Sequence, residues 1–377
     1  VANKLTTGVT KIYSNGRAFA ALKDDGSLVT WGESSYGGDS NEVSNQLKSG
    51  VTKIFSTDSS FSALKSDGSV VTWGKYIGES DGFDFASVSS KLQSNVKTIS
   101  VTDTSYAALK NDGSVVTWGG IEDFNFGEDS SSVSSDLSSE VEKIYSNHWS
   151  FAALKSDSSV ITWGSSVHGG DGNIWDYQNE EWSKVGSTTS KLSGEIVSIQ
   201  STFYAFAALK SDGSVVAWGD AQSGGNTSSV ASDLTSGVTK IFSNGKAFAA
   251  LKSDGSVITW GNSDSGGDSS SVSLEISNDV ENIYSTYNAF SALKKDGSVI
   301  TWGNASYGGD SSSVASSLNS NVFNLSDIRV DEKLDQSPTI LLPTSTDTAT
   351  YLLYEGIPTL TINENITSIY TFSADEE

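Results

Sequence analysis

The stretch VTKIFSNGKAFAALKSDGSVITWG, residues 238–261, decides the fold of this chain. It predicts a meander of three short strands, over residues 238–242, 248–252 and 256–260. Between the last two strands lies Ser253-Asp254-Gly255, whose glycine can adopt a positive φ, as in a three-residue hairpin with a glycine bulge. The second and third strands are apolar on both faces, so a sheet made from them must be covered on both sides.

The same phrase occurs seven times within residues 1–324. A three-stranded unit cannot bury two apolar faces by itself, so each copy must stack against two neighbours. Seven units achieve this in a closed ring, and the sequence therefore predicts an all-β fold, a seven-bladed β-propeller; a β-solenoid is the competing architecture. The Trp-Gly pairs that end the copies are 42 to 55 residues apart, and they begin at Trp31, Trp73, Trp118, Trp163, Trp218, Trp260 and Trp302.

The copies differ in a turn and in their connectors. Six copies keep the Asp-Gly pair, but the fourth has Asp157-Ser158, which we expect to strain or loosen its turn. After each Trp-Gly a loop leads to a V-x-x-x-L pattern such as Val314–Leu318, which predicts a short outer helix, with a fourth strand as the alternative. Because residues 1–5 repeat this connector, either it completes the last blade and closes the ring, or further repeats precede it.

Composition excludes several classes of function. The 377 residues hold 46 Asp and Glu against 23 Lys and Arg, a net charge of −23, which would repel nucleic acid. The absence of cysteine excludes disulfides, thiolate nucleophiles and cysteine-ligated metals. No apolar run is long enough for a transmembrane helix, so we expect no membrane insertion. The chain starts at Val1 and contains no Met, which indicates a part of a longer multidomain protein.

The repeat resembles that of the regulator of chromosome condensation family, whose units follow the pattern aL-x-x-dG-x-V-x-x-WG and whose seven units form a seven-bladed propeller. In one copy the matching residues are Ala250-Leu251, Asp254-Gly255, Val257, Trp260-Gly261 and Gly266-Gly267. The resemblance implies the fold and not a function, because the family's GQLG is GGDS here and the basic elements that favour chromatin contact are absent. The Ser-rich, Cys-free, near-identical copies look more like the repeats of large bacterial surface proteins.

The sequence changes character after the repeats. Residues 325–337 form a charged linker, and residues 338–377 are rich in short β-type runs. The phrase LTINENITSIYTFSADEE, residues 360–377, resembles the opening of a cadherin-like or immunoglobulin-like module of bacterial adhesins. We expect a β-rich start of a further, incomplete module here.

Variation between copies indicates where a ligand would bind. In a meander the loop between the first two strands and the loop after Trp-Gly emerge at the same end, opposite the uniform Asp-Gly turns. The loop end varies most in the second to fourth repeats, and variation on one face of a constant scaffold is typical of a binding surface. Our candidate ligand-binding residues are Tyr76, Phe83, Phe85, Phe124, Phe126, His148, Trp149, His168, Trp175, Tyr177 and Trp182.

Exposed aromatic rings beside carboxylates suit stacking on a sugar or docking of a protein. The alternative interpretation is that these rings fold back and fill the inserted loops.

The acidic loops are a second candidate site. Carboxylates among flexible glycines can hold Ca²⁺, although one aspartate in each loop falls short of the six to eight oxygens of a calcium site. The alternative is that each aspartate caps the turn that follows it. The aspartates concerned are Asp39, Asp129, Asp171, Asp268 and Asp310.

Signals for catalysis are weak, since no nucleophile elbow, zinc motif or phosphate-binding loop occurs. His148 and His168 fall in neighbouring loops of one repeat, and a pair of facing carboxylates would suffice for a glycosidase. We expect no enzyme and no cofactor. The sequence favours an extracellular recognition or adhesion module of a bacterial surface that binds a glycan or a protein; a purely structural propeller and a glycoside hydrolase-like enzyme are the alternatives.

Overall fold

The computed structural model describes residues 2–75, 85–120, 126–172, 174–176, 181–183, 192, 195–320, 322, 350–351 and 360–361. The chain divides into two compact units, Val1–Val322 and Phe323–Glu377. In the second unit β24 (Thr350–Tyr351) pairs antiparallel with β25 (Leu360–Thr361). The predicted linker and adhesin-type module otherwise lie outside the described residues and stay predictions.

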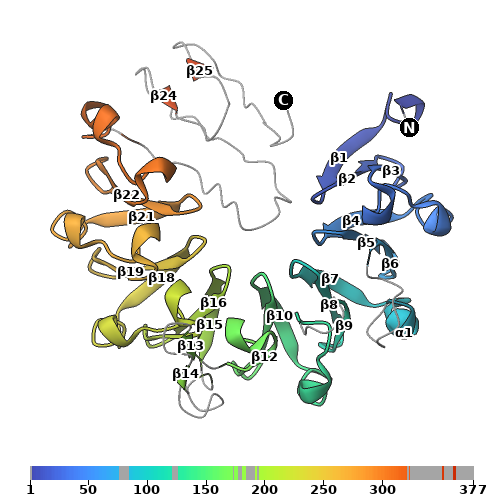
Figure 1. Cartoon of the computed structure of the whole chain (residues 1–377), viewed down its shortest axis with the longest axis horizontal. Coiled ribbons are helices and arrows are strands. Elements are labelled where there is room, and N and C mark those ends of the chain that lie inside the picture. The colour runs from blue at the N-terminus through green and yellow to red at the C-terminus, as the bar shows by residue number, and fades with distance from the viewer. Residues whose placement is uncertain are drawn as a thin grey trace. The chain divides into compact units, whose positions relative to one another are not determined.

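The first unit contains seven sheets that follow one another around a common centre (Figure 1), each with three antiparallel strands in sequence order. This confirms the predicted all-β, seven-bladed propeller pattern, whereas the expected closure of the ring is not seen, because blades 1 and 7 stand apart (Figure 1). We call the sheets blades 1 to 7. Blades 1 to 3 are β1 (Val9–Ser14), β2 (Ala18–Lys23) and β3 (Leu28–Gly32); β4 (Val51–Ser56), β5 (Ser60–Lys65) and β6 (Val70–Gly74); β7 (Val96–Val101), β8 (Ser105–Lys110) and β9 (Val115–Gly119). Blades 4 to 7 are β10 (Val141–Ser146), β11 (Ser150–Lys155) and β12 (Val160–Gly164); β15 (Ile196–Ser201), β16 (Ala205–Lys210) and β17 (Val215–Asp220); β18 (Val238–Ser243), β19 (Ala247–Lys252) and β20 (Val257–Gly261); β21 (Val280–Ser285), β22 (Ala289–Lys294) and β23 (Val299–Gly303).

The inserted loop of the fourth repeat adds to the next blade. Its strands β13 (Ile174–Asp176) and β14 (Glu181–Ser183) form an antiparallel pair, in which Trp175 is the register partner of Trp182. Strand β13 runs parallel to β17, so blade 5 becomes a five-stranded sheet in the order β14-β13-β17-β16-β15.

The Asp-Gly turns form the uniform end of the blades. Gly255 has φ +82° and closes its turn by donating its amide hydrogen to Lys252 O. In the fourth copy Ser158 adopts φ +64° and donates in the same way to Lys155 O. The turn is therefore not loosened: the serine keeps the glycine's geometry and carries the strain of a left-handed backbone.

The connectors that the structure describes contain short 3-10 turns, preceded in blade 2 by one turn of α-helix, and no fourth strand of their own blade. Leu234, at the end of one V-x-x-x-L pattern, is buried, which explains the spacing. The one α-helix among the described residues is α1 (Phe85–Val88). The 3-10 turns are Ala2–Lys4, Ser34–Tyr36, Asn41–Val43, Ser89–Leu92, Ser131–Val133, Ser166–His168, Ala221–Ser223, Ser228–Val230, Ser263–Ser265, Ser270–Val272, Ala305–Tyr307 and Ser312–Ser317. None of the helices in the described ranges is long and apolar enough to cross a membrane.

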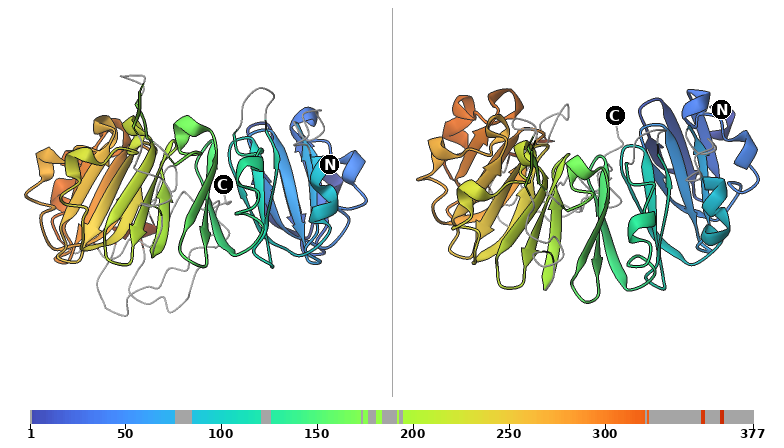
Figure 2. Two further views of the ribbon diagram at one scale, coloured as in Figure 1. Left: turned by 90° about the horizontal axis from the view of Figure 1, so that it is seen from below. Right: turned by 60° about the horizontal axis from the view of Figure 1, so that its bottom comes forward.

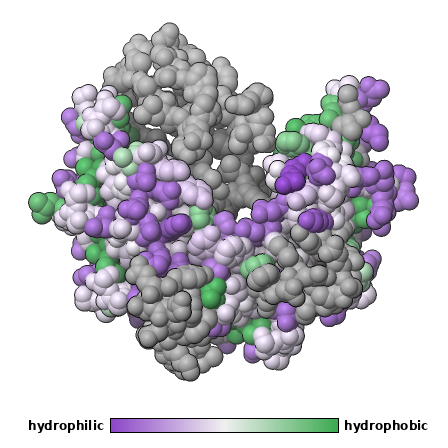
Figure 3. Space-filling model, viewed as in Figure 1, coloured by the Kyte–Doolittle hydropathy of each residue, from purple (hydrophilic) through white to green (hydrophobic). Residues whose placement is uncertain are grey.

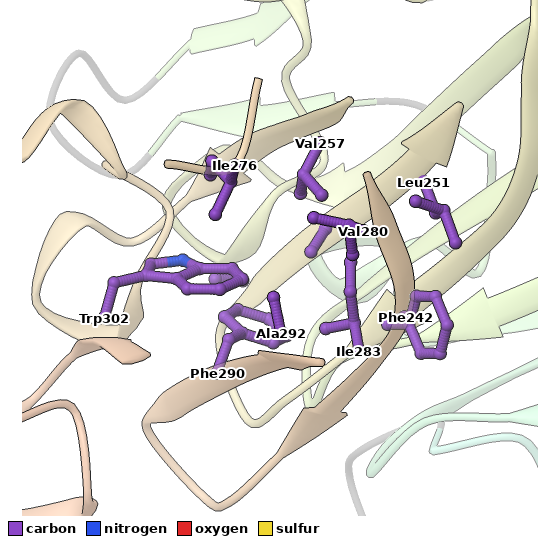
Figure 4. Close-up of a cluster of buried hydrophobic side chains, with 11 residues drawn as sticks. Phe242, Leu251, Val257, Ile276, Val280, Ile283, Phe290, Ala292 and Trp302 are labelled. Carbon is purple, nitrogen blue, oxygen red and sulfur yellow. The ribbon is translucent and has the colours of Figure 1, made fainter. Parts of the chain in front are cut away.

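The hydrophobic core lies between blades, not within them. Figure 4 shows the cluster between blades 6 and 7, where Phe242 and Leu251 of blade 6 meet Ile283, Phe290 and Trp302 of blade 7. Described residues form six such clusters, one at each junction from blade 1 to blade 7. Burial on both faces is what the apolar second and third strands predicted. In the side views of Figure 2 the blades stand next to one another with their loops at two opposite ends.

Candidate binding surface

Each blade presents two loops at one end, and a repeated hydrogen bond joins them. The inner loop lies between the first and second strands, and the outer loop follows Trp-Gly. In blade 4 the Asn147 amide donates to His168 O over 2.8 Å, and in blade 6 Asn244 donates to Ser265 O over 2.6 Å. Thr102 and Thr202 take the same role in blades 3 and 5. The two loops therefore belong to one surface, as the meander predicted.

Backbone hydrogen bonds also join the inner loops of successive blades. The series runs from blade 2 to blade 7, and in each step one loop's N–H donates to the next loop's carbonyl. The steps are Asp58 to Asp103 (2.8 Å), Asp103 to His148 (2.9 Å), His148 to Phe203 (3.1 Å), Phe203 to Gly245 (3.0 Å) and Gly245 to Tyr287 (3.0 Å). The side chains at these positions are held in a fixed order around the centre of the unit.

On this frame rings of blades 3, 4, 5 and 7 form a series, which we call the aromatic band; the inner loop of blade 6 contributes Gly245 and no ring. The two parts of the series meet where His148 lies 5.7 Å from Tyr204. Trp149 lies 5.5 Å from Phe126 and 4.3 Å from His168, measured between ring centroids. Tyr204 lies 5.0 Å from Trp149. The series continues through His148–Phe203 (4.3 Å), Phe203–Tyr287 (4.8 Å) and Tyr287–Tyr307 (6.0 Å).

The aromatic band is accessible to a ligand along much of its length. Tyr287 and Tyr307 are 54% and 44% exposed, and Phe126, Trp149, Phe203 and Tyr204 are half-buried. A polar group lies within it, since His148 Nδ1 is 2.9 Å from Asp103 Oδ2. In the face drawn in Figure 3 most coloured residues are hydrophilic and hydrophobic ones occur in small groups. The aromatic band therefore differs from the rest of the surface, which is acidic and rich in hydroxyl groups, because it presents accessible rings beside a carboxylate.

The structure separates the candidate residues proposed from sequence. Phe126, His148, Trp149 and His168 belong to the aromatic band, whereas Phe85 packs inward, 6.0 Å from Trp118. The backbones of Trp175 and Trp182 are in the added hairpin. The remaining candidates, Tyr76, Phe83, Phe124 and Tyr177, lie outside the described residues.

Sequence reasoning missed half of the band. Phe203, Tyr204 and Tyr287 occupy the same inner-loop positions as His148 and Trp149, and Asp103 does so in blade 3. Aligning the inner loops position by position would have revealed them. The long insertions in the outer loops are the more conspicuous differences between the copies.

The acidic loops make turn-capping hydrogen bonds. Asp39 Oδ1 accepts the amide hydrogen of Asn41 over 2.9 Å, and Asp129 Oδ1 accepts that of Ser131 over 2.8 Å. Asp268 and Asp310 accept equivalent bonds from the residue two positions on, each over 2.9 Å. Asp171 is exposed. Within the described ranges no three His, Asp or Glu side chains gather in the manner of a metal site, and calcium binding stays a prediction.

Burial of His168 makes the stability of the fold depend on pH. Its residue is 5% exposed, its Nδ1 lies 2.7 Å from Ser165 Oγ, and burial, aided by nearby His148, lowers its pKa from 6.5 to about 4. In the unfolded chain this histidine is therefore protonated below pH 6.5, whereas in the folded chain it stays neutral down to about pH 4. We expect the free energy of unfolding to fall by about 2 to 3 kcal/mol between pH 6.5 and pH 4.5 from this group, and to change little above pH 6.5.

Urea unfolding at pH 7.0, 5.5 and 4.5 measures this effect. The control variant His168→Gln cannot take up the proton, so its stability should be flatter in that window. Equal pH profiles for the two proteins would show that the histidine is not the cause. The turn aspartates such as Asp254, whose pKa is lowered by hydrogen bonds from Ser256, and Asp220, whose pKa is raised by burial, are present in both proteins. The difference between the two pH profiles therefore reports on His168 and not on these carboxyl groups.

Comparisons add likenesses to solved propellers. No protein-family model and no curated protein matches the chain. Prp20p from Saccharomyces cerevisiae, described with its binding to Gsp1p and histones, is similar with a TM-score of 0.40 and 16% identity, over 68% of this chain and 72% of that one. The same yeast RCC1 (Prp20) in complex with Kap60 gives 0.40 and 18%, over 67% and 70%. The ectodomain of the Physcomitrella patens receptor kinase CR4 gives 0.36 and 12%, over 79% and 74%. The fold is established by the seven sheets themselves.

Proposed function

We propose that this chain is a non-enzymatic recognition module that binds a glycan along its aromatic band. The observation that carries the proposal is the unbroken series of rings from Phe126 to Tyr307, with the Asp103–His148 pair among them. A sugar has a C–H face that stacks on such rings and hydroxyls that hydrogen-bond to a carboxylate or an imidazole. Rigid rings lose little conformational entropy on binding, which favours affinity.

The architecture supports this proposal in a second way. The inner loops are held by the backbone series from Asp58 to Tyr287, so the rings are pre-organised before a ligand arrives. A constant scaffold with different side chains at one loop position is how repeat proteins vary a binding surface. We further propose an extracellular, bacterial-surface setting, in keeping with a cysteine-free chain of net charge −23.

A glycan-array screen of the whole chain, with and without millimolar Ca²⁺, tests the proposal. We expect a sugar hit that Tyr287→Ala and Trp149→Ala each weaken by about tenfold or more. Tyr36→Ala is the matched control, because Tyr36 occupies the outer-loop position of Tyr307 but lies in blade 1, outside the band, under Arg17. A blank array, or equal losses for Tyr36→Ala and Tyr287→Ala, would overturn the proposal; a hit that needs Ca²⁺ would direct attention to the acidic loops.

A further inference from the structure

Four of the six junctions between blades share a hydrogen bond from a Trp indole to an outer-loop glycine of the preceding blade. The buried indole N–H groups of Trp118 and Trp218, at the other two junctions, have no hydrogen-bond partner among the described residues. The outer-loop glycine of one blade lies against the Phe and Trp rings of the next. At the junction of blades 6 and 7, the Trp302 indole N–H donates to Gly266 O over 3.0 Å, and a Cβ on Gly266 would come within 2.9 Å of Phe290. The same indole-to-glycine bond joins Trp73 to Gly37, Trp163 to Gly127 and Trp260 to Gly224.

Blade 1 carries the same Phe and Trp rings on its outer side, and among the described residues no outer-loop glycine of another blade lies against them. Phe19 is 43% exposed although its counterpart Phe290 is 1% exposed, and Ile12 is 45% exposed although its counterpart Ile283 is 1% exposed. Trp31, stacked on Phe19 at 5.2 Å, is half-buried where Trp302 is 2% exposed. The residue types are those of the built junctions, except that blade 3 has Tyr106 in place of the Phe.

Blade 7 has the donating half. Gly308 has φ +93° and the same 3-10 turn before it as Gly266, yet no atom lies within 4 Å of the place where its Cβ would be. Its neighbours Tyr307 and Val314 are 44% and 42% exposed. The inner-loop series of backbone hydrogen bonds ends at this blade, at Tyr287, among the described residues. Blades 1 and 7 therefore carry complementary halves of one interface.

The two halves stand apart within the first unit (Figure 1). Closing the gap inside one chain would require rotation at junctions whose glycines lie too near the next blade's rings to admit even a methyl group. Interfaces packed to this density resist such rotation. The fitting occupant for each free half is the opposite half on another molecule.

We propose that this chain associates head to tail, with blade 7 of one copy packed against the outer side of blade 1 of a second copy. In this contact Gly308 would lie over Phe19 of the second copy, and the Trp31 indole N–H would donate to Gly308 O, as Trp302 does to Gly266. The interface is heterologous, so the end copies of any open assembly keep one free half each and can add further copies. Because each copy carries a net charge of −23, salt should strengthen the association by screening repulsion.

Sedimentation velocity of the whole chain tests the proposal over micromolar concentrations at about 0.05 M and 0.5 M NaCl. We expect the weight-average mass to rise at least twofold above the single-chain 39.7 kDa with concentration, and to rise further at the higher salt. Phe19→Asp should hold the chain at its single-chain mass. Leu274→Asp is the matched control, since Leu274 is an 85% exposed leucine on the connector of blade 6, and this variant should associate as the parent does.

A complementation experiment distinguishes head-to-tail contact from any other association. Phe19→Asp blocks the half on blade 1, and Gly308→Asn blocks the half on blade 7 while an asparagine tolerates the positive φ. Each variant alone should stay at the mass of one chain. An equimolar mixture should form dimers and nothing larger, because the Phe19→Asp variant keeps an intact blade 7 half and the Gly308→Asn variant keeps an intact blade 1 half. Both substitutions are at exposed positions, and circular dichroism confirms that the variants are folded.

Three results would overturn the proposal. They are a parent chain of single-chain mass at every concentration, association that Phe19→Asp leaves unchanged, and blocked variants that fail to pair. In the first case, acrylamide quenching of the parent chain and of Trp31→Phe would be compared, because the chain has ten tryptophans. A quenchable component that Trp31→Phe does not remove would mean that Trp31 is covered, and would identify a ring closed within one chain. The mass measurements do not depend on a glycan, so they and the proposed function can fail separately.

Discussion

Replacing Trp302 with alanine is expected to lower the free energy of unfolding by about 3 to 5 kcal/mol, whereas Trp31→Ala should cost far less. Trp302 is 2% exposed, packs on Phe290 at 5.4 Å and donates its indole hydrogen to Gly266 O. Its loss leaves a cavity between two blades and an unpaired carbonyl. Trp31 has the same place in its own blade but is half-buried, so water fills the space that its ring leaves.

Urea unfolding followed by circular dichroism, at concentrations where the chain is a single copy, measures both variants. The comparison is informative because the two tryptophans end the same sequence phrase and differ in what covers them. Equal losses for the two variants would mean that Trp31 is covered in solution by another blade. That outcome at low concentration would favour closure within the chain.

Gly224→Ala should destabilise the fold more than Gly308→Ala, by about 1 to 3 kcal/mol, because only the first places a methyl group inside a junction. The two glycines have nearly the same backbone, with φ +98° and +93°. Each alanine therefore carries a similar strain of about 1 to 2 kcal/mol. The added Cβ would come within 2.6 Å of Phe248 at Gly224, and it meets no atom within 4 Å at Gly308.

The difference between the two midpoints of denaturation reports the cost of packing the added methyl group, because the cost of the strained backbone is similar in both variants and cancels. If both alanines cost the same, the glycine is needed only for its φ, and close approach between blades is not what holds the junction. If Gly308→Ala costs more, the free half on blade 7 is covered under the conditions used.

The proposed glycan site and the proposed head-to-tail contact use different parts of the blades. The aromatic band consists of rings from loops of blades 3, 4, 5 and 7, while the free halves are the outer side of blade 1 and the edge of blade 7. They meet at Tyr307, which both ends the band and precedes Gly308. A copy docked at blade 7 would bring its blade 1, which contributes no ring to the band, next to Tyr307, so an assembly would carry one separate band on each copy. Multivalent display of one ligand surface raises avidity without a new contact.

The fold could be predicted from the sequence because the turn residues, the strand patterns and the repeat all indicate the same structure. The Asp-Gly turn, the apolar faces of the strand FAALK and the Trp-Gly end all indicate one meander, and its repetition indicates a ring-like stack. Even Ser158, which breaks the pattern, takes the glycine's backbone conformation, because the turn's hydrogen bonds and the sheet around it are stronger than one residue's preference.

The aromatic band could be predicted only in part. His148, Trp149 and His168 were named from the sequence because they stand in conspicuous loops. Phe203, Tyr204 and Tyr287 were not named, since each is a single change in a short, ordinary turn. Conversely Phe85 looked like a surface aromatic and packs against Trp118. The sequence shows which aromatic residues are present, but only the tertiary contacts show which of their rings are accessible to solvent.

What the sequence determined by itself is the local and repeated structure: strand, turn, bulge and the need for a neighbour on each face. These follow from short-range periodicity, which one copy of the repeat already contains. Tertiary structure alone decided which faces found a neighbour. Phe19 and Phe290 stand in the same phrase, yet one is exposed and the other buried, because burial depends on whether another blade packs there and not on the residue or its flanking sequence.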